Sequence, residues 1–282
     1  MKEPESAAIV SVYETGSSMS VKRSLYSGAS KGGPGGIRGS IKAYSRASRR
    51  RLLRKVAQLD RGVSPLFVTL TYPNAYPSDP EEWKRHLNSV WAKKLRRRHP
   101  KSGFIWRLEF QQRGAPHFHL LLYGVEEALR DFQTWLSRSW YDSVASGDEK
   151  HLRAGTNAIQ TTPGKGTMVY MAKEVGKTKQ AIAADYPEGI GRWWGVKYKD
   201  DLPWSDQKYR TITDPTANKI IRLMTKLAEL RSREYHSLTI FADGPFWAER
   251  LDEVIELFEG GSDLKPPARP LARLVAAEDR LL

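Results

Sequence analysis

The sequence predicts an α+β fold, with an antiparallel sheet and helices packed on it. Between residues 65 and 177, short β-branched runs and helically periodic runs follow one another as strand–helix–strand–strand–helix–strand, with a further helix after them. This order is the split βαβ arrangement of ferredoxin-like and RRM-like cores. Because crossover connections are right-handed, we expect the strand at 117–124 to lie between the other two, beside 65–72.

Each element of this core has its own signal. The run PLFVTLTY (65–72) is β-branched and aromatic, and is expected to be a buried strand. A helix should follow at 78–98, because Ser78 to Glu82 supplies an N-cap, a first-turn proline and early acidic residues. Its stripe includes Trp83 and Trp91, which we expect in the core, and it should stop at His99-Pro100.

The second half of the core begins with a hairpin. Strands are predicted at 104–111 and 117–124, joined by the turn QRGAP, and a helix at 126–140. A weaker strand is expected within 151–162 and a short helix at about 165–177.

The segments around this core divide the chain into four parts. Residues 1–62 form a basic, Gly-rich arm with a helix at 40–59, and residues 63–180 form the core. Residues 181–260 form a C-terminal α/β extension, with a helix at 214–234, a strand in SLTIFA and an acidic helix near 246–258. Residues 261–282 form a Pro-rich tail.

Charge and composition limit the possible functions. The 282 residues carry 46 Lys and Arg against 32 Asp and Glu, and the excess lies in residues 1–180. The absence of cysteine excludes disulfides, thiolate metal ligands and a thiol nucleophile. No signal peptide or apolar membrane span is visible, so we expect a cytoplasmic protein with a polyanionic partner such as nucleic acid.

An arginine-rich stretch lies on one side of the helix predicted at 40–59. Such a run is either a solvated face or a phosphate-contacting surface, and its single sign favours the second. The candidate DNA contacts there are Arg49, Arg50, Arg51 and Arg54.

Two histidines and one glutamate should share a face of the sheet. His117 and His119 are two residues apart on a strand, so both imidazoles emerge on one side while Phe118, Leu120 and Leu122 face the core. The hairpin places Glu109 across from 117 or 119. Two imidazoles and a carboxylate suit a divalent metal ion acting on a phosphate oxygen, although two polar residues on a solvated face would give the same pattern.

A tyrosine and two lysines share one side of the helix predicted at 165–177. Tyr170 and Lys173 are three residues apart, and Lys177 follows one turn later. Lysines near a phenol favour the phenolate, which can attack phosphorus. Ordinary packing with solvated lysines is the alternative.

Together these segments resemble the three motifs of HUH endonucleases, and more narrowly the rolling-circle replication initiators (Rep proteins) of plasmids and bacteriophages. The matching segments, in order, are FVTLTYP (67–73), PHFHLLLY (116–123) and VYMAK (169–173). GRWWGV (191–196) and SLTIFADG (237–244) also resemble plasmid-type initiators.

The resemblance implies a mechanism. His117 and His119, with Glu109 as third ligand, would hold Mg²⁺ or Mn²⁺. Tyr170 would attack single-stranded DNA at an origin hairpin, giving a 5′-phosphotyrosyl enzyme and a free 3′-OH, with Lys173 neutralising phosphate charge; Arg107 and Lys177 are further candidate DNA contacts. Glu174 stands where some phage relatives carry a second tyrosine, so a closing step would need a dimer or water.

Two other functions stay open. A single-tyrosine transposase or relaxase would use the same site, and a non-catalytic nucleic-acid-binding module could share the sheet. The glycines near Lys165 and Lys177 do not have the spacing of a phosphate-binding loop, so a separate host helicase, together with a polymerase, is expected. The oligomeric state, monomer or dimer, is open.

Overall fold

The computed structural model describes residues 7–13, 16–21, 41, 44–60, 62–161, 186, 189–206, 208–213, 215–216 and 237–240. The chain divides into two compact units, and each is treated by itself. One unit is Pro34–Trp204. The other combines Met1–Gly33 with Ser205–Leu282.

A five-stranded antiparallel sheet forms the centre of the Pro34–Trp204 unit. Its strands lie in the order β6-β3-β5-β4-β7. As predicted, β5 lies between β3 and β4 and pairs antiparallel with both. The bounds are β3 Leu66–Thr71, β4 Gly103–Phe110, β5 Pro116–Tyr123, β6 Thr156–Gln160 and β7 Trp194–Lys197.

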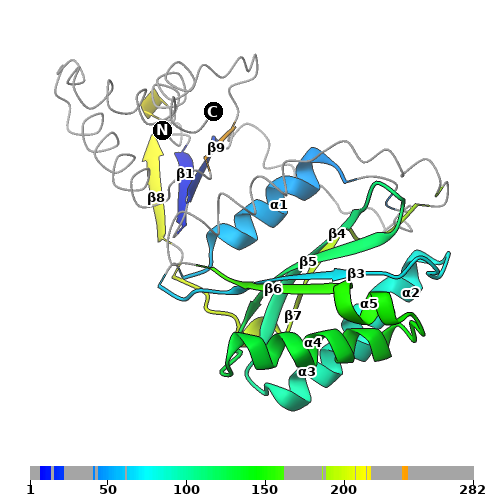
Figure 1. Cartoon of the computed structure of the whole chain (residues 1–282). Helices are drawn as coiled ribbons and strands as arrows, with labels where there is room; N and C mark the ends of the chain where they lie inside the picture. The colour runs from blue at the N-terminus through cyan, green and yellow to red at the C-terminus, as the bar shows by residue number, and fades with distance from the viewer. Residues whose placement is uncertain are drawn as a thin grey trace, which may run out of the picture. The chain divides into compact units, whose positions relative to one another are not determined.

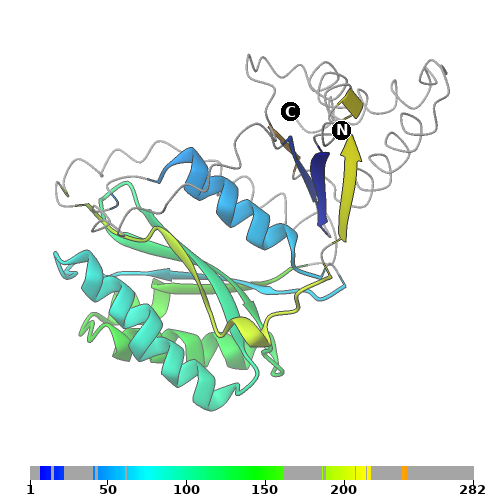
Figure 2. The same ribbon diagram turned by 180° about the vertical axis from the view of Figure 1, so that it is seen from behind.

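Helices cover both faces of this sheet, so the unit is an α+β structure. Figures 1 and 2 show α1 (Arg46–Ala57) on one face and the other helices on the opposite face. Those on the opposite face are α2 (Pro80–Arg85), the π-helical segment η1 (His86–Trp91), α3 (Ala92–Arg98), α4 (Leu129–Ser143) and α5 (Glu149–Ala154).

Local sequence explains where these helices begin. Ser45, Asp79 and Asp148 each stand before a helix, and their side chains accept a hydrogen bond from a backbone N–H of the first turn. The predicted 78–98 helix therefore begins one residue later than its first candidate cap, Ser78, and it contains the π-helical segment that the periodicity did not indicate.

The main apolar core lies between the sheet and the α2–α4 helices. Trp83 and Trp91 are fully buried, which confirms the prediction that they pack rather than stack on bases. Phe118 of β5 contacts Trp106 of β4 and Trp140 of α4 edge to face. The alternation of the hairpin strands therefore has the predicted sense, with its even-numbered residues facing the α2–α4 layer.

The second unit contains a four-stranded sheet in the order β8-β1-β2-β9. Its strands are β1 (Ala7–Tyr13), β2 (Gly16–Val21), β8 (Lys208–Thr213) and β9 (Ser237–Ile240). Only β9 was predicted from sequence, since β1 and β2 fall in the segment assigned to a basic arm. Helices predicted at 165–177 and 246–258, most of that at 214–234, and the Pro-rich tail lie outside the described residues.

Within the described parts of the chain, no helix combines the length and apolar character needed to cross a lipid bilayer.

Candidate functional site

Two rows of polar side chains cross the α1-covered face of the sheet. The strand register sets Thr71 of β3, His117 of β5 and Glu109 of β4 opposite one another in the first row. The second row contains Thr69, His119 and Arg107 at the corresponding positions. Both histidines therefore share one face with Glu109, as the alternation predicted, and Glu109 lies directly opposite His117.

The threonines of β3 contact the histidines through one particular ring nitrogen. Thr71 Oγ1 lies 2.8 Å from His117 Nδ1, and Thr69 Oγ1 lies 3.3 Å from His119 Nδ1. The two imidazole rings meet edge to face with centroids 4.4 Å apart. Since each threonine takes the Nδ1 side, the Nε2 side of each ring is directed elsewhere.

The Glu109 carboxylate links the histidines to a buried guanidinium. Its Oε1 lies 2.6 Å from Arg107 Nη1, and its Oε2 lies 3.5 Å from His119 Nε2. The side chains of Arg107 and Glu109 are only 1% and 8% exposed. Arg107 was predicted as a DNA contact, but its burial and its pairing place it to hold Glu109 rather than to meet a phosphate.

Tyr44, just before α1, covers this ion pair. The Arg107 guanidinium lies 5.0 Å from the centre of the Tyr44 ring, within the range of a cation–π contact. Burial raises the pKa of Tyr44 to about 12, with the Arg107 and Arg49 charges opposing the shift and the Glu109 charge adding to it. This phenol is therefore neutral at physiological pH, and it packs rather than attacks.

The donor set has the chemistry of a divalent metal site. Imidazole Nε2 atoms and a carboxylate oxygen are ordinary ligands, and two ligands on one ion lie roughly 3 to 4 Å apart, as His119 Nε2 and Glu109 Oε2 do. No group of three His, Asp or Glu side chains within the described ranges is spaced to hold an ion as it stands. One Glu109 oxygen is directed at Arg107, so a third contact would require this carboxylate to turn.

The end of β3 beside His117 is held by donors from three distant segments. The Thr71 carbonyl accepts hydrogen bonds from Trp140 Nε1 at 2.8 Å and from His151 Nε2 at 2.7 Å. Arg113 in the hairpin turn donates to the Tyr72 carbonyl at 2.5 Å. Burial lowers the pKa of His151, so this imidazole is neutral and can donate through one nitrogen. Sequence reasoning assigned His151 only a structural role, and no local signal linked it to β3.

Helix α1 brings cationic side chains to the same face. Arg50, Arg51 and Lys55 are exposed, whereas Arg49 and Arg54 are half-buried. The helix is anchored to the sheet by Leu52 and Val56 in the core and by the Trp194 indole, which donates to Ser48 Oγ at 3.0 Å.

Tyr170, Lys173 and Lys177 lie outside the described residues, so their predicted roles stay predictions. Trp193 is buried and Trp194 is half-buried with its indole bonded to α1, so neither presents a free ring.

The basic cluster at the end of α3 is partly used within the protein. Arg96 pairs with Asp201 at 2.6 Å, and Arg98 forms a two-point contact with Glu127 at 2.9 and 2.5 Å. Lys93 and Arg97 are exposed and take part in neither of these two pairs.

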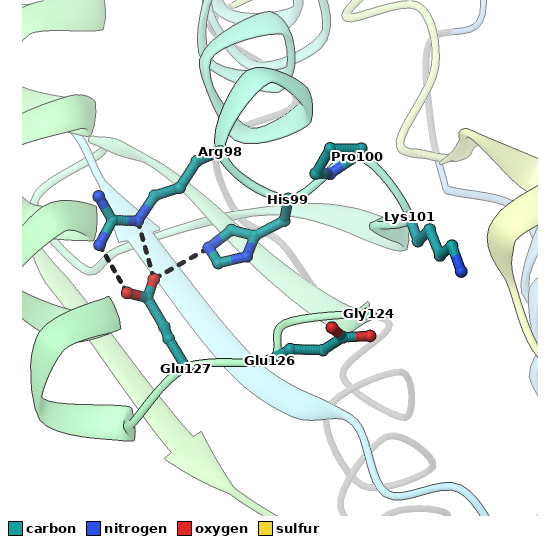
Figure 3. Close-up of a pocket in the computed structure, with 7 residues that line it drawn as sticks. All are labelled: Arg98, His99, Pro100, Lys101, Gly124, Glu126 and Glu127. Atoms are coloured by element: carbon teal, nitrogen blue, oxygen red, sulfur yellow. Dashed lines mark hydrogen bonds and ion pairs between the residues drawn. The ribbon is translucent and has the colours of Figure 1, made fainter.

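A pocket of about 490 Å³ lies beside this cluster (Figure 3), lined by Arg98, His99, Pro100, Lys101, Gly124, Glu126 and Glu127. Figure 3 shows Arg98 and His99 both reaching Glu127, which occupies the carboxylate internally. Gly124 follows the end of β5 remote from His117, so the pocket lies roughly 20 Å from the histidines at 3.3 Å per strand residue. It is not part of the site described above.

Comparison with known proteins indicates the class of this site. Residues 65–179 match the sequence model of the ORF2 family of replication-associated proteins, a range that contains β3, the histidine strand and Tyr170. The chain is also similar to a replication-associated protein of Pseudomonas phage Pf3, with 25% identity over 175 residues. That alignment covers 57% of this chain and 60% of the phage protein. No solved structure matches the chain.

Proposed function

We propose that this protein initiates rolling-circle replication by nicking single-stranded DNA with a HUH-type core. The observation that carries the proposal is the pair of rows across the sheet, with two histidines, Glu109 and two histidine-orienting threonines on one face. The match of residues 65–179 to replication-associated proteins supports it. The strand order β6-β3-β5-β4 is the one that a split βαβ core would have.

Each part of the site has a task in this proposal. His117, His119 and Glu109 hold Mg²⁺ or Mn²⁺, which when bound supplies Lewis-acid polarisation of a phosphate oxygen. The Tyr170 hydroxyl attacks the phosphorus, the P–O3′ bond breaks, and the proton ends on the departing 3′ oxygen. The products are a 5′-phosphotyrosyl link and a free 3′-OH, and the reverse reaction with a 3′-OH reseals the strand. Lys173 offsets negative charge on the phosphate.

Helix α1 contributes the electrostatic surface for DNA. Its exposed cations Arg50, Arg51 and Lys55 lie on the histidine face of the sheet, where a strand approaching the histidines would pass. Replacing all three with Gln should weaken binding of single-stranded DNA and reduce the salt dependence, by about 0.7 in the slope of log K against log salt for each lost phosphate contact. The matched control replaces Lys93 and Arg97, exposed cations of α3 on the opposite face, and should change the slope less. Equal effects would reject the assignment of α1.

Formation of a covalent adduct tests the chemistry. Purified protein is incubated with labelled single-stranded DNA carrying hairpins and with Mn²⁺, and adducts are resolved on a denaturing gel. Wild type should form an adduct that Tyr170→Phe does not. Tyr141→Phe, on α4 and away from the histidine face, is the control and should retain it. An adduct with Tyr170→Phe would disprove this nucleophile, and DNA binding without any adduct would reduce the protein to a binding module.

A further inference from the structure

The T-x-T pattern of β3 has a counterpart in the geometry of the histidines. Thr69 and Thr71 are two residues apart, so their side chains share the face on which His117 and His119 lie. Each threonine hydroxyl meets the Nδ1 atom of the histidine opposite it, and the shorter contact is that of Thr71 and His117 at 2.8 Å. A neutral imidazole carries one proton, so the partner of one nitrogen determines what the other can do.

We infer that Thr71 is a positioning residue that fixes His117 as the Nδ1–H tautomer and so leaves Nε2 as a lone-pair donor for a divalent cation. This inference rests on the proposed function for the cation. In this arrangement His117 Nδ1–H donates to Thr71 Oγ1. The reverse arrangement, with the hydroxyl donating to Nδ1, would put the proton on Nε2 and block it as a ligand. Histidine ligands are generally oriented in this way, by a hydrogen bond from the ring nitrogen that does not touch the metal.

Thr71 can serve as a fixed acceptor because its backbone is held on both sides. Its N–H donates to the Gly155 carbonyl at 2.8 Å, and its carbonyl accepts from the side chains of Trp140 and His151. These partners come from α4, from α5 and from the residue that follows α5. The last residue of β3 is therefore anchored to the α4–α5 layer while its side chain points to the opposite face.

Thr71→Val and Thr71→Ser form a matched pair for the test. Valine keeps the shape of threonine and removes the hydroxyl, whereas serine keeps the hydroxyl and removes the methyl group. Two quantities are measured on the full chain: Mn²⁺ affinity by calorimetry, and the protonated nitrogen of His117 from ¹⁵N shifts in the metal-free protein. Thr71→Val should weaken Mn²⁺ binding about 10- to 100-fold, the usual effect of losing an outer partner of a histidine ligand. Thr71→Ser should stay within about threefold of wild type, which is small on the scale of such losses.

The two readouts separate this inference from the proposed function. Wild type should show His117 protonated at Nδ1, and Thr71→Val should lose this preference while Thr71→Ser keeps it. Proton occupancy at Nε2 in wild type, Mn²⁺ affinity of Thr71→Val equal to wild type, or equal losses in both variants would overturn the role of Thr71. If wild type binds no Mn²⁺ yet shows the Nδ1–H tautomer lost only in Thr71→Val, the role of Thr71 stands and the metal-dependent function fails.

Discussion

The ion pair of Arg107 and Glu109 should be strongly coupled in the folding free energy. Its atoms Nη1 and Oε1 are 2.6 Å apart, and both side chains are more than nine-tenths buried. Removing one partner from such a pair leaves a buried charge and costs about 3–5 kcal/mol, whereas removing both avoids that charge. Arg107→Met and Glu109→Gln, made singly and together, should therefore give a coupling energy of about 2–4 kcal/mol.

The surface pair Arg85 and Glu82 is the control for this cycle. Its atoms are 3.2 Å apart, and the side chains are 57% and 39% exposed. Because water screens such a pair, the same cycle with Arg85→Met and Glu82→Gln should give about 0.2–1 kcal/mol. Urea unfolding followed by tryptophan fluorescence suits the measurement, since the three tryptophans at 83, 91 and 140 are fully buried in this unit. A coupling at Arg107 and Glu109 of less than about 1 kcal/mol, equal to the control, would refute the view that they act as a desolvated unit.

Three further variants test other parts of this unit. Burial lowers the pKa of His151 from 6.5, so its contribution to stability is present above pH 6.5 and falls as pH drops through the lowered value; His151→Gln keeps an N–H donor and should flatten urea-unfolding stability between about pH 7 and 5. The hydrogen bond from Arg98 lowers the pKa of Glu127 from 4.5, so Glu127→Gln should destabilise the protein at about pH 7, and its deficit should vanish as pH falls through that lowered pKa in a pH-dependent denaturation series. Gly124 has φ +74° and a Cβ there would collide with the Lys101 carbonyl, whereas Gly147 has φ +67° and open space; Gly147→Ala should cost about 1 kcal/mol in thermal unfolding and Gly124→Ala clearly more, and equal costs would contradict the steric argument.

Local pattern was sufficient for much of the central sheet. The period-2 alternation of the two hairpin strands assigned each side chain to a face, because successive residues of a strand point to opposite sides. The short turn set the register closely enough to bring Glu109 to the histidines, and the structure places it opposite His117. The strands β1, β2 and β8 were not predicted. Strand β1 pairs with β8 from the last third of the chain, where Ala7 lies opposite Thr213, and such a distant partner leaves no signal in a local window.

The sequence by itself determined that two imidazoles and a carboxylate share one face of an antiparallel sheet, since strand periodicity and a short hairpin are local properties. Only the tertiary structure decided which groups orient them. Thr71 meets His117 across 46 positions and His151 across 80, and Arg107 turned from an expected DNA contact into the buried partner of Glu109 beneath Tyr44. These contacts depend on how separate elements pack, and burial then determines whether a charge meets solvent or another side chain.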